Sequence, residues 1–120
     1  IFSRKKIAVK YANEIINELI CMPISQELTP NQLKHHVFHL FVIRVQDRKR
    51  FQAYMEKKDI GTMIHYPIPP HKQRAYFDYS SLSLPITEKI HQEVISLPIG
   101  PTMKSKDIDT IIETVNAYTE

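Results

Sequence analysis

The sequence predicts an α+β domain in which a small three-stranded sheet is covered by helices. Helical and extended patterns alternate along its 120 residues, the extended segments are rich in β-branched residues, and the longest helical patterns are amphipathic. This length can bury one compact core, so we expect residues 1–120 to form a single domain. Within it we expect a leading helix over residues 1–22 and an α+β core over residues 35–120.

The first expected element is a long amphipathic helix from Arg4 to Ile20, where apolar residues recur at helical spacing. Pro23 ends this helix. Cys21 closes its apolar stripe, so we expect a packed side chain and not an accessible nucleophile. A single cysteine cannot form an internal disulfide and fits a reducing compartment, which predicts a cytoplasmic protein.

Three segments are expected to form the strands. Val37–Val45 is almost continuously apolar, as is typical of a central strand covered on both faces. A shorter strand is expected from Thr62 to Tyr66. Val94–Leu97 is the third, and Pro98 ends it.

The first helix of the core is expected to begin at Asp47, whose side chain can cap it, and to end near Lys58. Gly61 is expected to take the left-handed conformation at the exit. The inward-facing residues of this helix are Phe51, Tyr54 and Met55.

Two more helices are expected in the second half of the chain. One begins near Thr87 and ends near Glu93, and the last opens near Ser105 or Asp107. The apolar stripe of the last helix has the spacing i, i+3, i+4, i+7 and consists of Ile108, Ile111, Ile112 and Val115.

Composition excludes several classes of function. The net charge is only +3, and the basic residues are scattered among acids, so we expect no nucleic-acid partner. The basic clusters Arg4–Lys6 and Arg48–Arg50 are interpreted as solvated helix starts. No apolar run approaches the roughly 20 residues of a membrane span, so we expect no membrane partner. With only two glycines, Gly61 and Gly100, the chain has no nucleotide-binding loop.

The histidines at 35, 36 and 39 suggest a metal site, but strand geometry argues against it. His35 and His39 would share one face of a strand at a spacing too long to chelate one ion. We therefore predict no metal. His35 and His36 are expected in solvent, and His39 either inside the fold or at a partner surface.

The segment from Thr62 to Tyr76 is the candidate functional loop, because it contains three prolines and two histidines. Prolines fix an extended path, and rigid loops that carry imidazole and phenol groups often contact ligands. The candidates are His65, Tyr66 and His71. A stiff surface connection with no ligand is the alternative interpretation. Three aromatic residues follow the loop and are expected to pack against the neighbouring helix: Tyr76, Phe77 and Tyr79.

Three segments, taken in their order along the chain, resemble the C-terminal part of the DegT/DnrJ/StrS sugar aminotransferases. They are Val37–Arg44, Gly61–Tyr76 and Leu84–Pro98. The resemblance implies the small domain of a pyridoxal-phosphate enzyme of the aspartate-aminotransferase fold type. Such enzymes move an amino group, usually from glutamate, onto a nucleotide-linked keto sugar. They work as dimers, with active sites between subunits and between domains.

The resemblance also implies which residues bind substrate. His65 and Tyr66 would approach the sugar or cofactor pocket, and His71 and Gln73 would shape it.

The chain has no counterpart of the large domain that holds the cofactor lysine in this family, and neither Lys5 nor Lys6 is expected to replace that lysine. We therefore expect a fragment that is inactive alone and binds no pyridoxal phosphate alone. One alternative is a stand-alone α+β module that binds a small molecule or regulates another protein. Another is a domain for protein interaction only.

Overall fold

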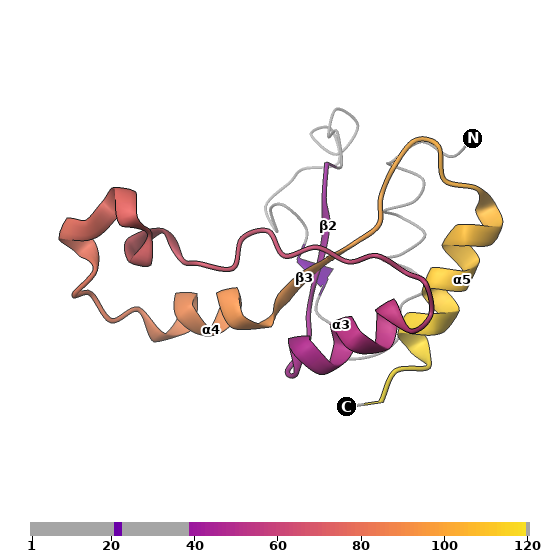
Figure 1. The fold of residues 1–120 in the computed structure, drawn as a ribbon, viewed down its shortest axis with the longest axis horizontal. Coiled ribbons are helices and arrows are strands. Elements are labelled where there is room, and N and C mark those ends of the chain that lie inside the picture. The colour runs from indigo at the N-terminus through magenta and orange to yellow at the C-terminus, as the bar shows by residue number, and fades with distance from the viewer. Residues whose placement is uncertain (1–20, 23–38, 120) are drawn as a thin grey trace.

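The computed structural model describes residues 21–22 and 39–119. The expected helix from Arg4 to Ile20, the basic cluster Arg4–Lys6, and His35 and His36 lie outside these residues. The elements in chain order are β1 (Cys21–Met22), β2 (Phe41–Arg44), α3 (Arg48–Glu56), the 3-10 helices η1 (Pro70–Lys72) and η2 (Arg74–Tyr79), α4 (Pro85–Glu93), β3 (Val94–Leu97) and α5 (Ser105–Asn116) (Figure 1).

The sheet has three antiparallel strands in the order β1-β2-β3, which confirms β2 as the central strand. In its register Phe41 lies opposite Leu97 and Ile43 opposite Ile95. These facing apolar pairs place one side of β2 in the core, while all four residues of β3 are buried.

The third strand is not the one that the sequence predicted. Within Thr62–Tyr66 only Met63 pairs with the sheet, through an isolated bridge to Ser96. Pro67 has no N–H to continue a ladder, and the chain leaves the edge of β3 before reaching it. The third strand is instead β1, so the backbone of Cys21 pairs with Ile43 rather than ending a helix.

Helix α3 begins as predicted and ends earlier. The Asp47 side chain accepts a hydrogen bond from the Arg50 N–H at 3.0 Å. The helix stops at Glu56 rather than near Lys58, so the left-handed position falls on Asp59, with φ of 61°, and not on Gly61. Aspartate tolerates this conformation better than most residues, because its short polar side chain can bond locally.

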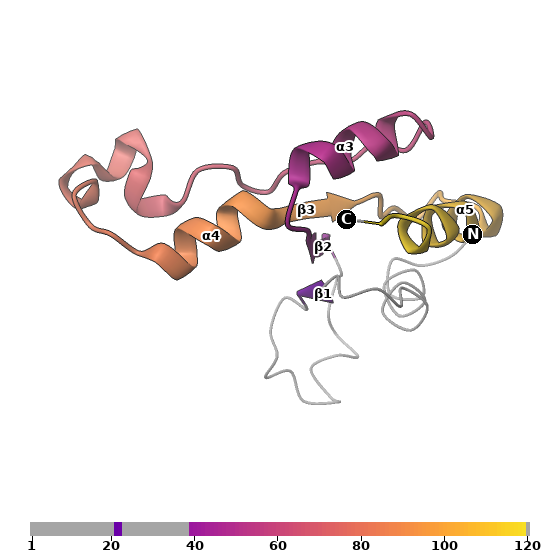
Figure 2. The same cartoon turned by 90° about the horizontal axis from the view of Figure 1, so that it is seen from below.

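Helix α4 begins at Pro85, two residues before the predicted start, because proline suits the first turn of a helix, where its missing N–H has no partner to lose. The 3-10 helices η1 and η2 were not predicted. We call residues 64–93 the arm: they leave the sheet after Met63 and return to it at β3. Figures 1 and 2 show the arm projecting away from α3 and α5.

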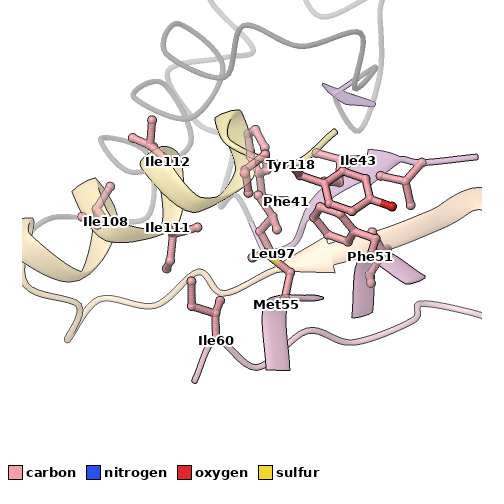
Figure 3. Packing of buried hydrophobic residues seen from close by; sticks show 13 residues of the cluster. Phe41, Ile43, Phe51, Met55, Ile60, Leu97, Ile108, Ile111, Ile112 and Tyr118 are labelled. Carbon is pink, nitrogen blue, oxygen red and sulfur yellow. The ribbon is translucent and has the colours of Figure 1, made fainter. Parts of the chain in front are cut away.

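The hydrophobic core lies at the opposite end of the molecule, where α3 and α5 pack with β2 and β3 (Figure 3). Phe51 meets Tyr118 edge to face, with ring centroids 5.0 Å apart. Burial of each large apolar side chain contributes roughly 1.5–3 kcal/mol. The fully buried residues are Ile43, Phe51, Met55, Ile95, Ile108 and Val115. The predicted stripe of α5 is confirmed, because all four of its residues are buried. Within the arm, by contrast, His71 is the only buried residue.

Among the described residues, no helix combines the length and the apolar character that crossing a membrane requires.

Candidate functional site

The base of the arm is fixed to β3 through one residue, Ser96. The backbone N–H of Ser96 donates to the Met63 carbonyl at 2.7 Å, and the Met63 N–H donates back to the Ser96 carbonyl at 3.2 Å. The Ser96 side chain is buried, and its Oγ lies 2.9 Å from His65 Nδ1. The imidazole of His65 is thus half-buried and held against the sheet.

Tyr66 stands next to this anchored imidazole and remains open to the outside. Its side chain is 66% exposed, and its ring contacts the His65 ring at right angles, with centroids 5.8 Å apart. Its backbone carbonyl accepts a hydrogen bond from His91 Nδ1 at 2.7 Å. The structure therefore brings the predicted residues His65 and Tyr66 together, with a fixed backbone and an accessible phenol.

The other two predicted residues, His71 and Gln73, brace the arm from inside. His71 is 7% exposed, and its Nε2 lies 3.0 Å from Glu88 Oε1. Gln73 Nε2 donates to the Ile68 carbonyl at 3.1 Å, which closes the proline loop on itself. Neither residue hydrogen-bonds to His65 or Tyr66 in the part of the chain that the structure describes. The four candidates thus form two groups, one open and one internal.

Glu88 is the centre of the internal group. The hydrogen bond from His71 lowers the pKa of Glu88, and a bond from the Leu84 N–H at 3.1 Å lowers it further. Both bonds favour the ionised form of Glu88, because a carboxylate is a better hydrogen-bond acceptor than a protonated carboxyl group. Since a carboxylate only accepts, His71 Nε2 carries the proton that the two groups share.

Lys72 extends this group to the turn that follows η2. Its Nζ donates to the Ser80 carbonyl at 2.8 Å and to the Leu82 carbonyl at 2.9 Å. The same ammonium lies 3.9 Å from Glu88 Oε1. Together with His71, it ties η1 to the start of α4, so the tip of the arm is closed by polar contacts.

Sequence reasoning missed four residues of this arrangement: Lys72, Glu88, His91 and Ser96. Glu88 carried a local signal, because an acidic residue in the first turn of a helix is a common partner for free N–H groups. His91 and Ser96 carried none. Their partners lie 25 and 31 positions away in the chain, so only the fold reveals them.

The basic cluster at the start of α3 was interpreted as solvated, and for Arg48 this is wrong. Arg48 is half-buried and its Nη1 donates to the carbonyls of His91 and Val94, where α4 passes into β3. Burial lowers the pKa of Arg48. Lys49 and Arg50 are exposed, as predicted.

The arm exposes many large apolar side chains. Every exposed large hydrophobic side chain among the described residues lies between Met63 and Ile86. The expectation that Tyr76, Phe77 and Tyr79 pack against a neighbouring helix is wrong, since all three are exposed, Phe77 by 76%. The physical reason is that the arm leads away from the core helices (Figure 2). Surfaces of this kind are typical of interfaces. We call this set, which includes Met63 directly before the arm, the apolar surface of the arm: Met63, Tyr66, Ile68, Tyr76, Phe77, Tyr79, Leu82, Leu84 and Ile86.

A shallow cavity of about 360 Å³ lies elsewhere, at the end of α3. It is lined by Gln52, Glu56, Asp59, Ile60, Gly61 and Thr62, and it includes none of the predicted site residues. Its two carboxylates make it a poor site for an anion.

Within residues 21–22 and 39–119, no group of three or more His, Cys, Asp or Glu side chains could hold a metal ion. His39 is exposed, and its contact with a partner surface stays a prediction.

The chain is similar to several characterised proteins. It is 47% identical over 115 residues to dTDP-3-amino-3,6-dideoxy-alpha-D-galactopyranose transaminase from Aneurinibacillus thermoaerophilus, a match that covers 96% of this chain and 30% of that protein. It is 34% identical over 86 residues to dTDP-3-amino-3,4,6-trideoxy-alpha-D-glucose transaminase from Streptomyces venezuelae, covering 70% of this chain and 23% of that protein. The chain thus spans less than a third of the length of these relatives.

Solved structures show the same likeness. DesV of S. venezuelae, crystallised in complex with a ketimine intermediate, superposes with a TM-score of 0.79 at 27% identity, covering 95% of this chain and 30% of DesV. NtdA from Bacillus subtilis with bound cofactor PMP gives a TM-score of 0.75 at 27% identity, covering 94% of this chain and 27% of NtdA. These likenesses confirm the predicted fold class.

The family model described as the DegT/DnrJ/EryC1/StrS aminotransferase family matches residues 1–116, almost the whole chain. The match confirms the resemblance found in the sequence. This chain belongs to the DegT/DnrJ/EryC1/StrS aminotransferase family.

Proposed function

We propose that this chain is the small C-terminal domain of a pyridoxal-phosphate-dependent aminotransferase that transfers an amino group from an amino acid, with glutamate as the expected donor, to a nucleotide-linked keto sugar. The family match and the two dTDP-sugar transaminases among its relatives support this proposal. Because the chain spans less than a third of those relatives, the reaction belongs to a longer polypeptide.

One observation carries the assignment of the site: Tyr66 is exposed beside an anchored His65, at the base of an arm whose apolar surface is also exposed. An exposed phenol beside a half-buried imidazole that is held in place can hydrogen-bond to the hydroxyl and keto oxygens of a sugar. We therefore assign His65 and Tyr66 to one wall of the substrate cleft. His71 and Gln73 hold the loop that carries this wall.

We propose that the described residues hold no pyridoxal phosphate. This cofactor needs a lysine amine for covalent attachment and several donors for its phosphate. Lys72, the lysine nearest to the predicted site in sequence, is bonded to the Ser80 and Leu82 carbonyls, and the cavity at the end of α3 is lined by Glu56 and Asp59. We place the cofactor on the remaining polypeptide and propose that the chain alone is inactive.

The apolar surface of the arm supports a second proposal, that this end of the molecule contacts another part of the enzyme. A monomeric soluble protein seldom exposes so many large apolar side chains on one segment. We propose that this surface packs against the large domain or the second subunit of a homodimer, which would complete the cleft beside Tyr66. A cytoplasmic location without nucleic-acid or membrane partners is part of the same proposal.

The test uses the complete polypeptide that contains this chain, supplied with pyridoxal phosphate, glutamate and a panel of dTDP- and UDP-linked keto sugars. We expect an aminated sugar by mass spectrometry, with 2-oxoglutarate formed in equal amount. Failure with every sugar of the panel would contradict the proposal. The 120-residue chain alone is expected to give no absorbance band of a lysine-bound cofactor on titration with pyridoxal phosphate; such a band would show that the chain holds its own cofactor site.

A further inference from the structure

The carbonyl of Tyr66 is held by a histidine that the sequence did not single out. His91 lies in the last turn of α4, and its Nδ1 is 2.7 Å from the Tyr66 carbonyl oxygen. A carbonyl oxygen can only accept, so Nδ1 must carry a hydrogen. This contact fixes the neutral ring as the Nδ1–H tautomer and leaves Nε2 without a hydrogen.

The turn that carries His91 is itself fixed to the core. Arg48, at the start of α3, donates from Nη1 to the His91 carbonyl and also to the Val94 carbonyl at 3.3 Å. Two residues after His91, Glu93 pairs with Arg44 of β2, whose Nε lies 3.0 Å from Glu93 Oε2. The imidazole of His91 therefore projects from a point where α3, α4 and the sheet are tied together.

Tyr66 needs such a support because little else orients it. Its side chain is 66% exposed, and the contact described for its ring is with His65. The direction of an exposed phenol then depends on the position of its own backbone. The bond from His91 fixes that backbone directly before Pro67, whose ring restricts the conformation of the residue that it follows.

We infer that His91 is a positioning residue for the substrate wall: by holding the Tyr66 carbonyl through Nδ1, it sets where the Tyr66 phenol meets the sugar. The inference rests on the proposed function of Tyr66. Either form of the ring can make this bond, because a protonated imidazole also donates from Nδ1.

The test compares His91→Leu with His91→Asn in the complete polypeptide. The Asn amide nitrogen is as many bonds from Cα as Nδ1 is, so it can donate to the same carbonyl, whereas Leu cannot. We expect His91→Leu to lower kcat/KM for the sugar by about three- to tenfold, the range that one lost hydrogen bond represents. His91→Asn should recover most of this loss. Gln92→Leu, at the exposed residue that follows His91 on α4, serves as the control and should match the wild type.

Equal losses in His91→Leu and His91→Asn, or no loss in either, would overturn the inference. A second measurement does not depend on activity: the ¹⁵N shifts of His91 should report the Nδ1–H tautomer, and the ¹³C shift of the Tyr66 carbonyl should move in His91→Leu and return in His91→Asn. An Nε2–H tautomer or an unmoved carbonyl shift would also overturn it. If the wild type aminates no sugar while these shifts behave as expected, the proposed function is wrong, but the hydrogen bond from His91 to the Tyr66 carbonyl is confirmed.

Discussion

His65 Nδ1 lies 2.9 Å from Ser96 Oγ, although the two residues are 31 positions apart in the chain. Ser96 also pairs through its backbone with Met63, two residues before His65. One buried serine therefore fixes both the path of the chain into the arm and the ring at its base. This relationship fixes the base of the proposed substrate wall to the sheet at two points.

Replacing Ser96 with alanine should loosen this anchor without breaking the sheet. The variant loses one partly buried side-chain hydrogen bond, so we expect the free energy of unfolding to fall by about 1 kcal/mol. The imidazole of His65 should gain rotational freedom, visible as sharper and shifted NMR signals of the ring. Ser83→Ala, at an exposed serine of the same arm, is the control. Identical behaviour of the two variants would mean that the contact between Ser96 and His65 stabilises nothing.

The Glu88 contacts should make the tip of the arm sensitive to acid. The folded arm lowers the pKa of Glu88 from its ordinary value of 4.5, so the unfolded state binds the proton more readily. The stabilisation is then fully present above pH 4.5 and declines as the pH falls from there toward the folded pKa. Glu88→Gln should abolish this decline, because its amide does not titrate in this range.

The measurement is a urea titration at several pH values, followed through NMR signals of arm residues. The difference between wild type and Glu88→Gln should be largest near neutrality and shrink as the solution becomes more acidic. Glu113→Gln, at an exposed position on α5, should show no such pattern. A difference that stays constant from neutral pH to strongly acidic pH would contradict the role given to Glu88.

The apolar surface of the arm should make the isolated chain associate. Phe77 and Ile86 are 76% and 77% exposed, so in the absence of a partner their burial between copies is favourable. Sedimentation velocity should show a mass that rises with concentration, and the double variant Phe77→Ser, Ile86→Ser should remain monomeric with an unchanged melting temperature. A wild-type chain that stays monomeric at high concentration would contradict this expectation.

Much of the fold could be predicted because the pattern of each main element is local. The segment that forms β2 stands out as a continuous apolar run, and the stripe of α5 is long enough to show its helical period in the sequence. β1 could not be found, because two residues carry no period and their partners lie in β2. The misplaced left-handed residue, Asp59 instead of Gly61, followed from a helix end that was set two residues too late.

Only part of the site could be predicted, because some of its contacts join residues that are far apart in the sequence. His65 and Tyr66 stood out because three prolines follow them closely, and the structure places them side by side. Whether His71 and Gln73 contact substrate stays a prediction, since the described contacts of both side chains are within the arm. His91 acts across a gap of 25 residues and was recognised only once the fold was known.

The central claim, that Tyr66 faces substrate and not the core, is tested most directly by removing one hydroxyl at a time. Tyr54 is the matched control, because its hydroxyl donates to the Thr114 carbonyl at 3.1 Å within the core region. In the complete polypeptide, Tyr66→Phe should lower kcat/KM for the sugar by about tenfold with little change in melting temperature, whereas Tyr54→Phe should do the reverse. Equal activity of Tyr66→Phe and wild type, or a loss of activity that only follows a loss of stability, would contradict the claim.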